Sequence, residues 1–156
     1  MKVEIVNFPE TKVAVLEHWG PPALEHQTAR KLISWRIENG LLPSSTNRSY
    51  GVHYGDPNTT PPSEHHVDFC ISVDHQIAAN SFGVINKVIP ALRCAKTRHF
   101  GSREDVIVAR YLYEEWLPKS GERLGAFPVI FHYVNVGPNV KECEMITDVY
   151  LPLVRE

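Results

Sequence analysis

Apolar and polar residues alternate with a period of two along several short stretches of the chain, and this alternation predicts β-strands. In the first half the alternating stretches are 3–8, 12–19, 50–54 and 67–73. Between the second and third of them, largely apolar residues recur at helical spacing from Leu24 to Trp35. Pro21-Pro22 precedes this segment and Asn39-Gly40 follows it, which suits a helix start and a helix stop.

The second half of the chain shows the same order of patterns. Strands are predicted at 83–89, 92–100, 128–134 and 146–153. A helix is predicted after Gly101, with Ser102 as its N-cap and Asp105 three residues on, and it ends at Gly121. Each half therefore reads as β-β-α-β-β, and a proline, Pro9 or Pro90, interrupts its first two strands.

The two halves also share residues. When 3–40 is shifted by 81 positions without a gap, seven pairs coincide where composition alone gives roughly two. The pairs are Val3/Val84, Pro9/Pro90, Ala14/Ala95, His18/His99, Gly20/Gly101, Trp35/Trp116 and Gly40/Gly121. We therefore expect one domain over 1–156 with an internal repeat, 1–75 and 82–156. The expected fold is α+β: two pseudo-symmetric modules with antiparallel sheets, helices packed on the sheets and a ligand cleft at the module junction.

Composition narrows the functional classes. A net charge of −2 and a pI near 6.4 argue against direct nucleic-acid binding. No apolar run is long enough to span a membrane and no apolar leader follows the N-terminus, so we expect a cytoplasmic protein. Cys70, Cys94 and Cys143 show no disulfide or zinc spacing and are expected to be reduced, buried thiols.

Seven segments resemble, in order, those of the GyrI-like domain, the effector-binding domain of many AraC- and MerR-type regulators. The segments are His18-Trp19-Gly20-Pro21, Trp35 to Asn39-Gly40-Leu41, Tyr50 to Asp56-Pro57, Val67 to Cys70, Arg98 to Gly101, Glu115 to Gly121 and Thr147 to Leu153. The resemblance covers nearly the whole chain. It implies paired βαββ-type modules and a cleft for amphipathic, often cationic, aromatic molecules. The 156 residues leave no room for an attached DNA-binding module, so a free-standing binding domain is expected.

One position departs from the family pattern. Many members carry a buried Glu two residues before a Tyr on the strand after the second helix, and here Phe131 precedes Tyr133 at that spacing. Asp148 on the last strand is then the best remaining carboxylate to pair with a cationic ligand. Asp68 lies at a nearly equivalent point of the first half, offset by 80 rather than 81 positions.

Aromatic rings and these carboxylates make up the expected ligand site. Its predicted residues are Trp19, Tyr54, Asp68, His99, Phe100, Tyr113, Trp116, Phe131, Tyr133, Asp148 and Tyr150. Alternation places Phe131 and Tyr133 on one face of their strand, and Asp148 and Tyr150 on one face of theirs. Several of these side chains have a second interpretation. Trp116, like Trp35, fits core packing, and an Arg or a turn could satisfy either Asp.

The chemistry expected at this site is binding. The ligand is expected to be a small organic molecule, with lipophilic cations among the candidates, and no cofactor or metal is expected. His65 and His66 are adjacent and point to opposite faces of a strand, while His18 and His99 either flank the cleft or cap the turns at Gly20 and Gly101. Two alternatives remain: a protein–protein inhibitor of a topoisomerase-like partner, and a small hydrolase that uses a cleft carboxylate with a raised pKa. A homodimer is also compatible with the sequence.

Overall fold

The structure, a computed structural model, describes residues 2–55, 59–103, 106–137 and 139–155. Asp56, Pro57 and Asp105, which entered the sequence predictions, lie outside these residues. Two compact units form, one from 11–89 and the other from 2–10 together with 90–155. Below they are called the central unit and the terminal unit, and each consists of an antiparallel sheet covered by helix.

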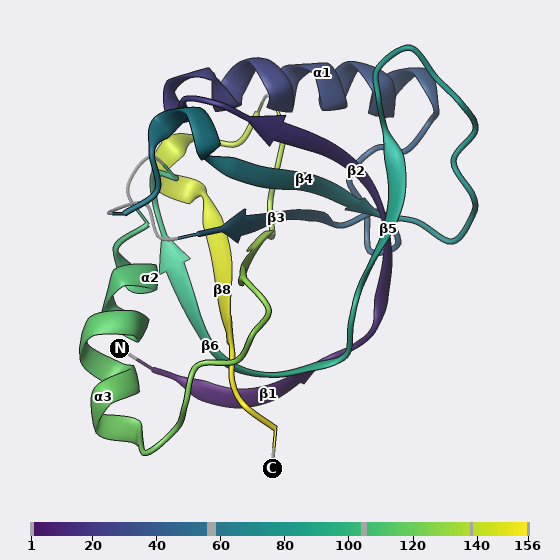
Figure 1. The fold of residues 1–156 in the computed structure, drawn as a ribbon. Helices are drawn as coiled ribbons and strands as arrows, with labels where there is room; N and C mark the ends of the chain where they lie inside the picture. The colour runs from purple at the N-terminus through teal and green to yellow at the C-terminus, as the bar shows by residue number, and fades with distance from the viewer. Residues whose placement is uncertain (1, 56–58, 104–105, 138, 156) are drawn as a thin grey trace. The chain divides into compact units, whose positions relative to one another are not determined.

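The central unit contains four strands in the order β3-β4-β2-β5. Its strands are β2 (Thr11–Trp19), β3 (Ser49–Tyr54), β4 (His66–Ser72) and β5 (Ile85–Ile89). A 3₁₀ turn (Pro22–Leu24) leads into helix α1 (Glu25–Glu38), and a second 3₁₀ turn (Pro62–Glu64) precedes β4. Helix α1 packs against β2 and β4 (Figure 1).

The core of the central unit lies between α1 and its sheet. Leu32 and Trp35 face the sheet from α1, and β2 and β4 contribute Ala14, Leu16 and Ile71. Strand alternation then sends the side chains of Glu17, Trp19, His66 and Asp68 to the opposite face of the sheet. The same alternation therefore fixes both the core and the polar face.

The terminal unit repeats the plan in the order β1-β6-β8-β7. Its strands are β1 (Glu4–Phe8), β6 (Leu92–Phe100), β7 (Val129–Tyr133) and β8 (Ile146–Pro152). Its helical segment comprises α2 (Ile107–Tyr111), a π-helical turn (Leu112–Trp116) and α3 (Leu117–Ser120), and a 3₁₀ turn (Glu142–Glu144) precedes β8. Val108 and Leu112 pack from this segment onto Ala95, Val149 and Leu151.

The first strand of each repeat pairs with the second strand of the other repeat. β1 pairs with β6, and β5 pairs with β2, so neither β1-β2 nor β5-β6 forms a hairpin. The chain passes from one unit to the other after Glu10 and returns at Pro90. Pro9 and Pro90, the repeat-equivalent prolines, mark these passages, where a fixed φ and a missing N–H interrupt a strand.

The predicted α+β class, antiparallel sheets and helical coverage are confirmed, and every predicted strand is present to within two residues at each end. The predicted N-cap is wrong, because α2 begins at Ile107 after Val106 and Ser102 precedes the helix. The helix stops are confirmed: Gly40 and Gly121 have φ of +67° and +78°, which glycine adopts without strain. No helix among the described residues is long and apolar enough to cross a membrane.

Candidate functional site

Three aromatic rings form a stack across the central sheet, on the face opposite α1. The Trp19 and His66 rings lie 3.9 Å apart at 12°, and the His66 and Tyr54 rings lie 4.2 Å apart at 4°. The register explains the stack, since His66 on β4 is the direct partner of both Trp19 on β2 and Tyr54 on β3. Trp19 is 61% exposed, so much of the indole at the end of the stack faces solvent.

The next row of the same face is charged. Glu17 on β2 pairs directly with Asp68 on β4, two residues along from the aromatic row. The Lys87 Nζ on β5 donates to Glu17 Oε2 at 2.6 Å and to Asp68 Oδ2 at 2.8 Å. We call these residues the Asp68 cluster: Glu17, Trp19, Tyr54, His66, Asp68 and Lys87.

Asp68 is the centre of the cluster and is 2% exposed. Its Oδ1 lies 2.7 Å from His66 Nε2, and its Oδ2 accepts the Tyr54 hydroxyl at 3.1 Å as well as Lys87. Burial, with the neighbouring Asp68 charge and hydrogen bond, raises the pKa of Tyr54 to about 12, so Tyr54 is a neutral phenol that donates. The buried carboxylate is thus fully hydrogen-bonded, as its desolvation requires.

Ligand atoms suited to a metal also occur in this cluster. The nearest ligand-type atoms of Glu17, His66 and Asp68 lie within 4.8 Å of one another. His66 and Asp68 are, however, hydrogen-bonded to each other, and the Lys87 ammonium is bound to both carboxylates. The adjacent histidines point to opposite faces, as predicted. His66 faces Asp68, while His65 Nε2 lies 2.6 Å from Glu25 Oε2 on α1.

Asp148 has a different environment in the terminal unit. Arg98, its direct partner on β6, donates from Nε to Oδ1 at 2.7 Å and from Nη2 to Oδ2 at 3.0 Å, and Lys96 lies 3.7 Å from Oδ2. Burial would raise the pKa of Asp148, but the Arg98 hydrogen bonds and the Lys96 charge outweigh it and lower the pKa. The structure therefore shows the second interpretation of Asp148, a carboxylate paired with an Arg, and its role toward a ligand cation stays a prediction. A lowered pKa does not favour Asp148 as a general acid.

The predicted aromatic residues of the terminal unit separate onto two faces. Tyr150 lies on the Asp148 face, where its ring contacts Phe8 edge-on at 5.1 Å and Lys96 Nζ at 5.6 Å. Phe131 and Tyr133 pair with Val149 and Thr147 and therefore lie on the helix-covered face. Phe131 packs on the core there, and Arg103 lies 5.2 Å from the Tyr133 ring. The structure thus does not bring Phe131 and Tyr133 together with Asp148 and Tyr150.

The remaining predicted residues take several positions. His99 is buried, with Nε2 2.8 Å from the Ser102 carbonyl, and His18 makes the equivalent contact with the Pro21 carbonyl at 3.1 Å. The interpretation of both as turn-capping residues is confirmed. Trp116 is partly buried against the core, whereas Phe100 and Tyr113 are exposed.

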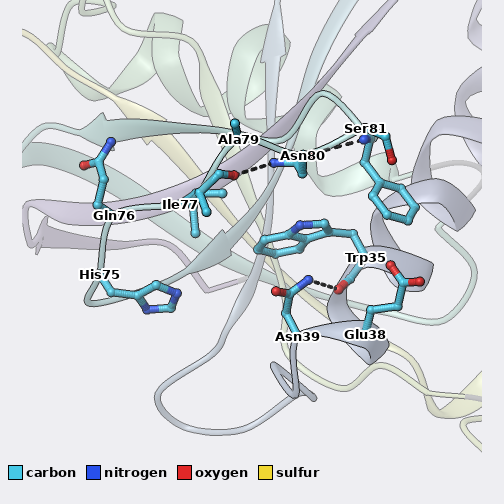
Figure 2. Close-up of a pocket in the computed structure, with 11 residues that line it drawn as sticks. Trp35, Glu38, Asn39, His75, Gln76, Ile77, Ala79, Asn80 and Ser81 are labelled. Atoms are coloured by element: carbon cyan, nitrogen blue, oxygen red, sulfur yellow. Dashed lines mark hydrogen bonds between the residues drawn. The ribbon is translucent and has the colours of Figure 1, made fainter.

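A separate hollow of about 440 Å³ lies on the helix side of the central unit. Figure 2 shows Trp35, Glu38 and Asn39 from the end of α1 facing the connector 75–82. Asn39 Nδ2 donates to the Trp35 carbonyl, and Asn80 bonds backbone atoms of its own loop. None of the sequence-predicted site residues lines this hollow.

Sequence reasoning missed three members of the Asp68 cluster: Glu17, His66 and Lys87. A signal for Lys87 was present, because Lys87 is two residues from both Ile85 and Ile89 and therefore shares their strand face. Its partners could not be found, however, because β5 pairs with β2 only after a long connection.

The fold is α+β, with helix on one face of each sheet, and the other face of the central sheet carries an aromatic stack beside a buried carboxylate. This arrangement suits a small-molecule-binding domain. The GyrI-like small-molecule-binding domain matches residues 1–154, and the chain belongs to this family. The chain is 38% identical over 154 residues to "Probable transcriptional regulator YgiV" of Escherichia coli K12, covering 98% of this chain and 96% of that protein. It is 28% identical over 157 residues to a "DNA gyrase inhibitor" of Erwinia billingiae, covering 98% and 97%.

Solved structures share the fold at low sequence identity. The EcmrR C-terminal domain is similar with a TM-score of 0.77 and 16% identity, covering 99% of this chain and 98% of that one. SAV2435 bound to tetraphenylphosphonium is similar with a TM-score of 0.60 and 8% identity, covering 99% and 94%. The resemblance inferred from the sequence is thereby confirmed at the level of family and fold.

Proposed function

We propose that this protein binds amphipathic aromatic molecules at the Trp19–His66–Tyr54 stack and acts as a ligand-sensing or ligand-sequestering domain. The observation that carries the proposal is the stack itself, with Trp19 61% exposed at its end. The exposed indole offers a large apolar face on which an aromatic ligand can stack.

The geometry beside Trp19 favours a stacked ligand. β5 pairs with β2 only over Thr11–Val15, so the part of β2 that carries Trp19 lies beyond this pairing. An aromatic ring of a ligand can therefore extend the row formed by Tyr54, His66 and Trp19. Aromatic contacts contribute about 0.5–1.5 kcal/mol beyond the area that they bury.

The family and one structural relative support this ligand class. Small-molecule binding is the property of the GyrI-like family, and SAV2435, which shares the fold, binds an aromatic cation. Of the residues predicted from the sequence, Trp19, Tyr54 and Asp68 carry the proposal. His99, Phe100, Tyr113, Trp116, Phe131, Tyr133, Asp148 and Tyr150 stay predictions as ligand contacts.

The test is a titration with Nile red, an uncharged aromatic dye whose fluorescence rises in an apolar site. We expect Trp19→Ala to weaken binding about tenfold or more, because burying an indole face contributes on the order of 2 kcal/mol. Ile33→Ala is the matched control, since Ile33 is an exposed apolar residue on α1 of the same unit. Equal dye affinity in wild type and Trp19→Ala would contradict the proposal.

A further inference from the structure

Lys87 occupies the position at which a ligand cation would meet the carboxylates of the Asp68 cluster. Its ammonium is bound to Glu17 Oε2 at 2.6 Å and to Asp68 Oδ2 at 2.8 Å, while its side chain is 31% exposed. Glu17 is 36% exposed and Asp68 is almost completely buried. The cation therefore sits where a solvent-facing carboxylate meets a buried one.

The register shows why this cation is needed. Glu17 and Asp68 are direct cross-strand partners, and like charges at such positions repel each other. Lys87 on the neighbouring strand β5 lowers that repulsion by pairing with both. Desolvation works against the charged form, but the hydrogen bonds from Lys87 to Asp68 and Glu17 prevail and raise its pKa, so the lysine stays charged.

Both carboxylate oxygens of Asp68 already have partners. His66 lies at Oδ1, and Tyr54 and Lys87 share Oδ2. An incoming cation would have to displace Lys87 and would gain no contact that the lysine does not already make. Lys87 is part of the chain, so it competes at an effective concentration of the order of millimolar or above.

We propose that Lys87 is a built-in counter-cation that determines which ligand charge the site accepts. The Trp19–His66–Tyr54 stack therefore binds uncharged aromatic amphiphiles in preference to lipophilic cations. This inference rests on the proposed function, because it concerns the ligand class of that same site. Asp148 follows the same pattern in the terminal unit, where Arg98 holds both of its oxygens.

The experiment compares two phenyl-substituted phosphorus compounds, uncharged triphenylphosphine oxide and the tetraphenylphosphonium cation, by isothermal titration calorimetry. For wild type we expect the oxide to bind more tightly than the cation. Lys87→Met should raise the affinity for tetraphenylphosphonium, relative to the affinity for the oxide, at least tenfold. Lys12→Met is the matched control, because Lys12 is an exposed lysine on β2 and lies outside the cluster.

A second pair of variants covers the case in which Lys87→Met does not fold, since that change leaves the buried Asp68 without its cation. Asp68→Asn removes the buried charge, and the double variant Asp68→Asn/Lys87→Met then leaves Glu17 as the free carboxylate. We expect the double variant to bind tetraphenylphosphonium at least fivefold more tightly than Asp68→Asn alone. Adding Glu17→Gln should abolish this gain.

The outcomes separate the two proposals. If the folded Lys87 variants gain no affinity for the cation while Trp19→Ala still weakens binding of the oxide, the charge-selectivity inference is wrong and the proposed function stands. If binding of the oxide is absent or insensitive to Trp19→Ala, the proposed function itself is wrong.

Discussion

Two equivalent positions with opposite charges give the two sheets different electrostatics. Glu17 and Arg98 are related by the 81-residue shift, and each is the direct cross-strand partner of an aspartate. Arg98 neutralises Asp148 within its own strand pair, whereas Glu17 adds to the charge of Asp68 and a third strand must supply Lys87. The sign of the charge at this one position thus decides which strand supplies the counter-cation of the buried aspartate.

Residue roles were predictable only where local pattern decides them. The turn-capping interpretation of His18 and His99 followed from their position before Gly20 and Gly101. The face on which Phe131 and Tyr133 lie could not be found, because alternation gives the period of a strand and only pairing gives its phase. The sequence leaves open whether Asp148 pairs with an Arg or meets a ligand, because only strand pairing shows that Arg98 lies opposite Asp148.

The single residue His53 makes the free energy of unfolding depend on pH. Burial, followed by the charge of His65, lowers the pKa of His53 to about 4 from its ordinary value near 6.5. Between these pH values the unfolded chain binds a proton at this residue and the folded chain does not, so stability falls as the pH drops from 6.5 to 4. A pKa change from 6.5 to about 4 corresponds to a loss of at most about 3 kcal/mol in the free energy of unfolding. The partial exposure of the His53 side chain makes the expected loss smaller than this limit.

The measurement is urea unfolding at intervals across that pH range. We expect His53→Gln to flatten the fall in unfolding free energy relative to wild type. His26→Gln, a change at an exposed histidine of α1, should keep the wild-type slope. A wild-type slope in His53→Gln would show that His53 protonates equally in the folded and unfolded states.

At the scale of elements, the sequence predicted the strands and helices better than their connections. Period-two alternation, the glycines after α1 and α3, and the interrupting prolines mark strands and helix ends directly. Strand pairing is a long-range property, and consecutive strands usually pair, which makes two hairpins the natural expectation. Pro9 and Pro90 instead mark the points where the chain changes unit.

The exchanged first strand can be tested by removing residues 1–8. Because β1 pairs with β6, the truncation uncovers an edge of β6 in the terminal unit and leaves β2 paired with β4 and β5. We expect faster native-state amide hydrogen exchange in 92–100 and little change in 11–19. Faster exchange in 11–19 without a change in 92–100 would mean that β1 pairs with β2 as a hairpin.

At the scale of the whole molecule, duplication supplies a common frame and divergence supplies the candidate chemistry. The pairs Gly20 with His65 and Gly101 with Met145 make the same 2.9 Å backbone hydrogen bond, which shows how closely the turns of the two units correspond. The aromatic stack, in contrast, is built on Trp19, His66 and Tyr54 of the central unit. Repeat matching predicts the frame, whereas the proposed binding surface consists of residues that do not match.

The central claim is that the ligand binds at the Trp19 end of the stack. The chain contains three tryptophans, and they report on three places: Trp19 on the stack, Trp35 at the hollow beside 75–82, and Trp116 on the helical face of the terminal unit. The most direct measurement is a ¹H–¹⁵N spectrum of the three indole N–H groups during titration with triphenylphosphine oxide. We predict a saturable shift of the Trp19 signal much larger than those of Trp35 and Trp116. A shift confined to Trp35 or Trp116, with Trp19 unchanged, would place the ligand elsewhere and contradict the account.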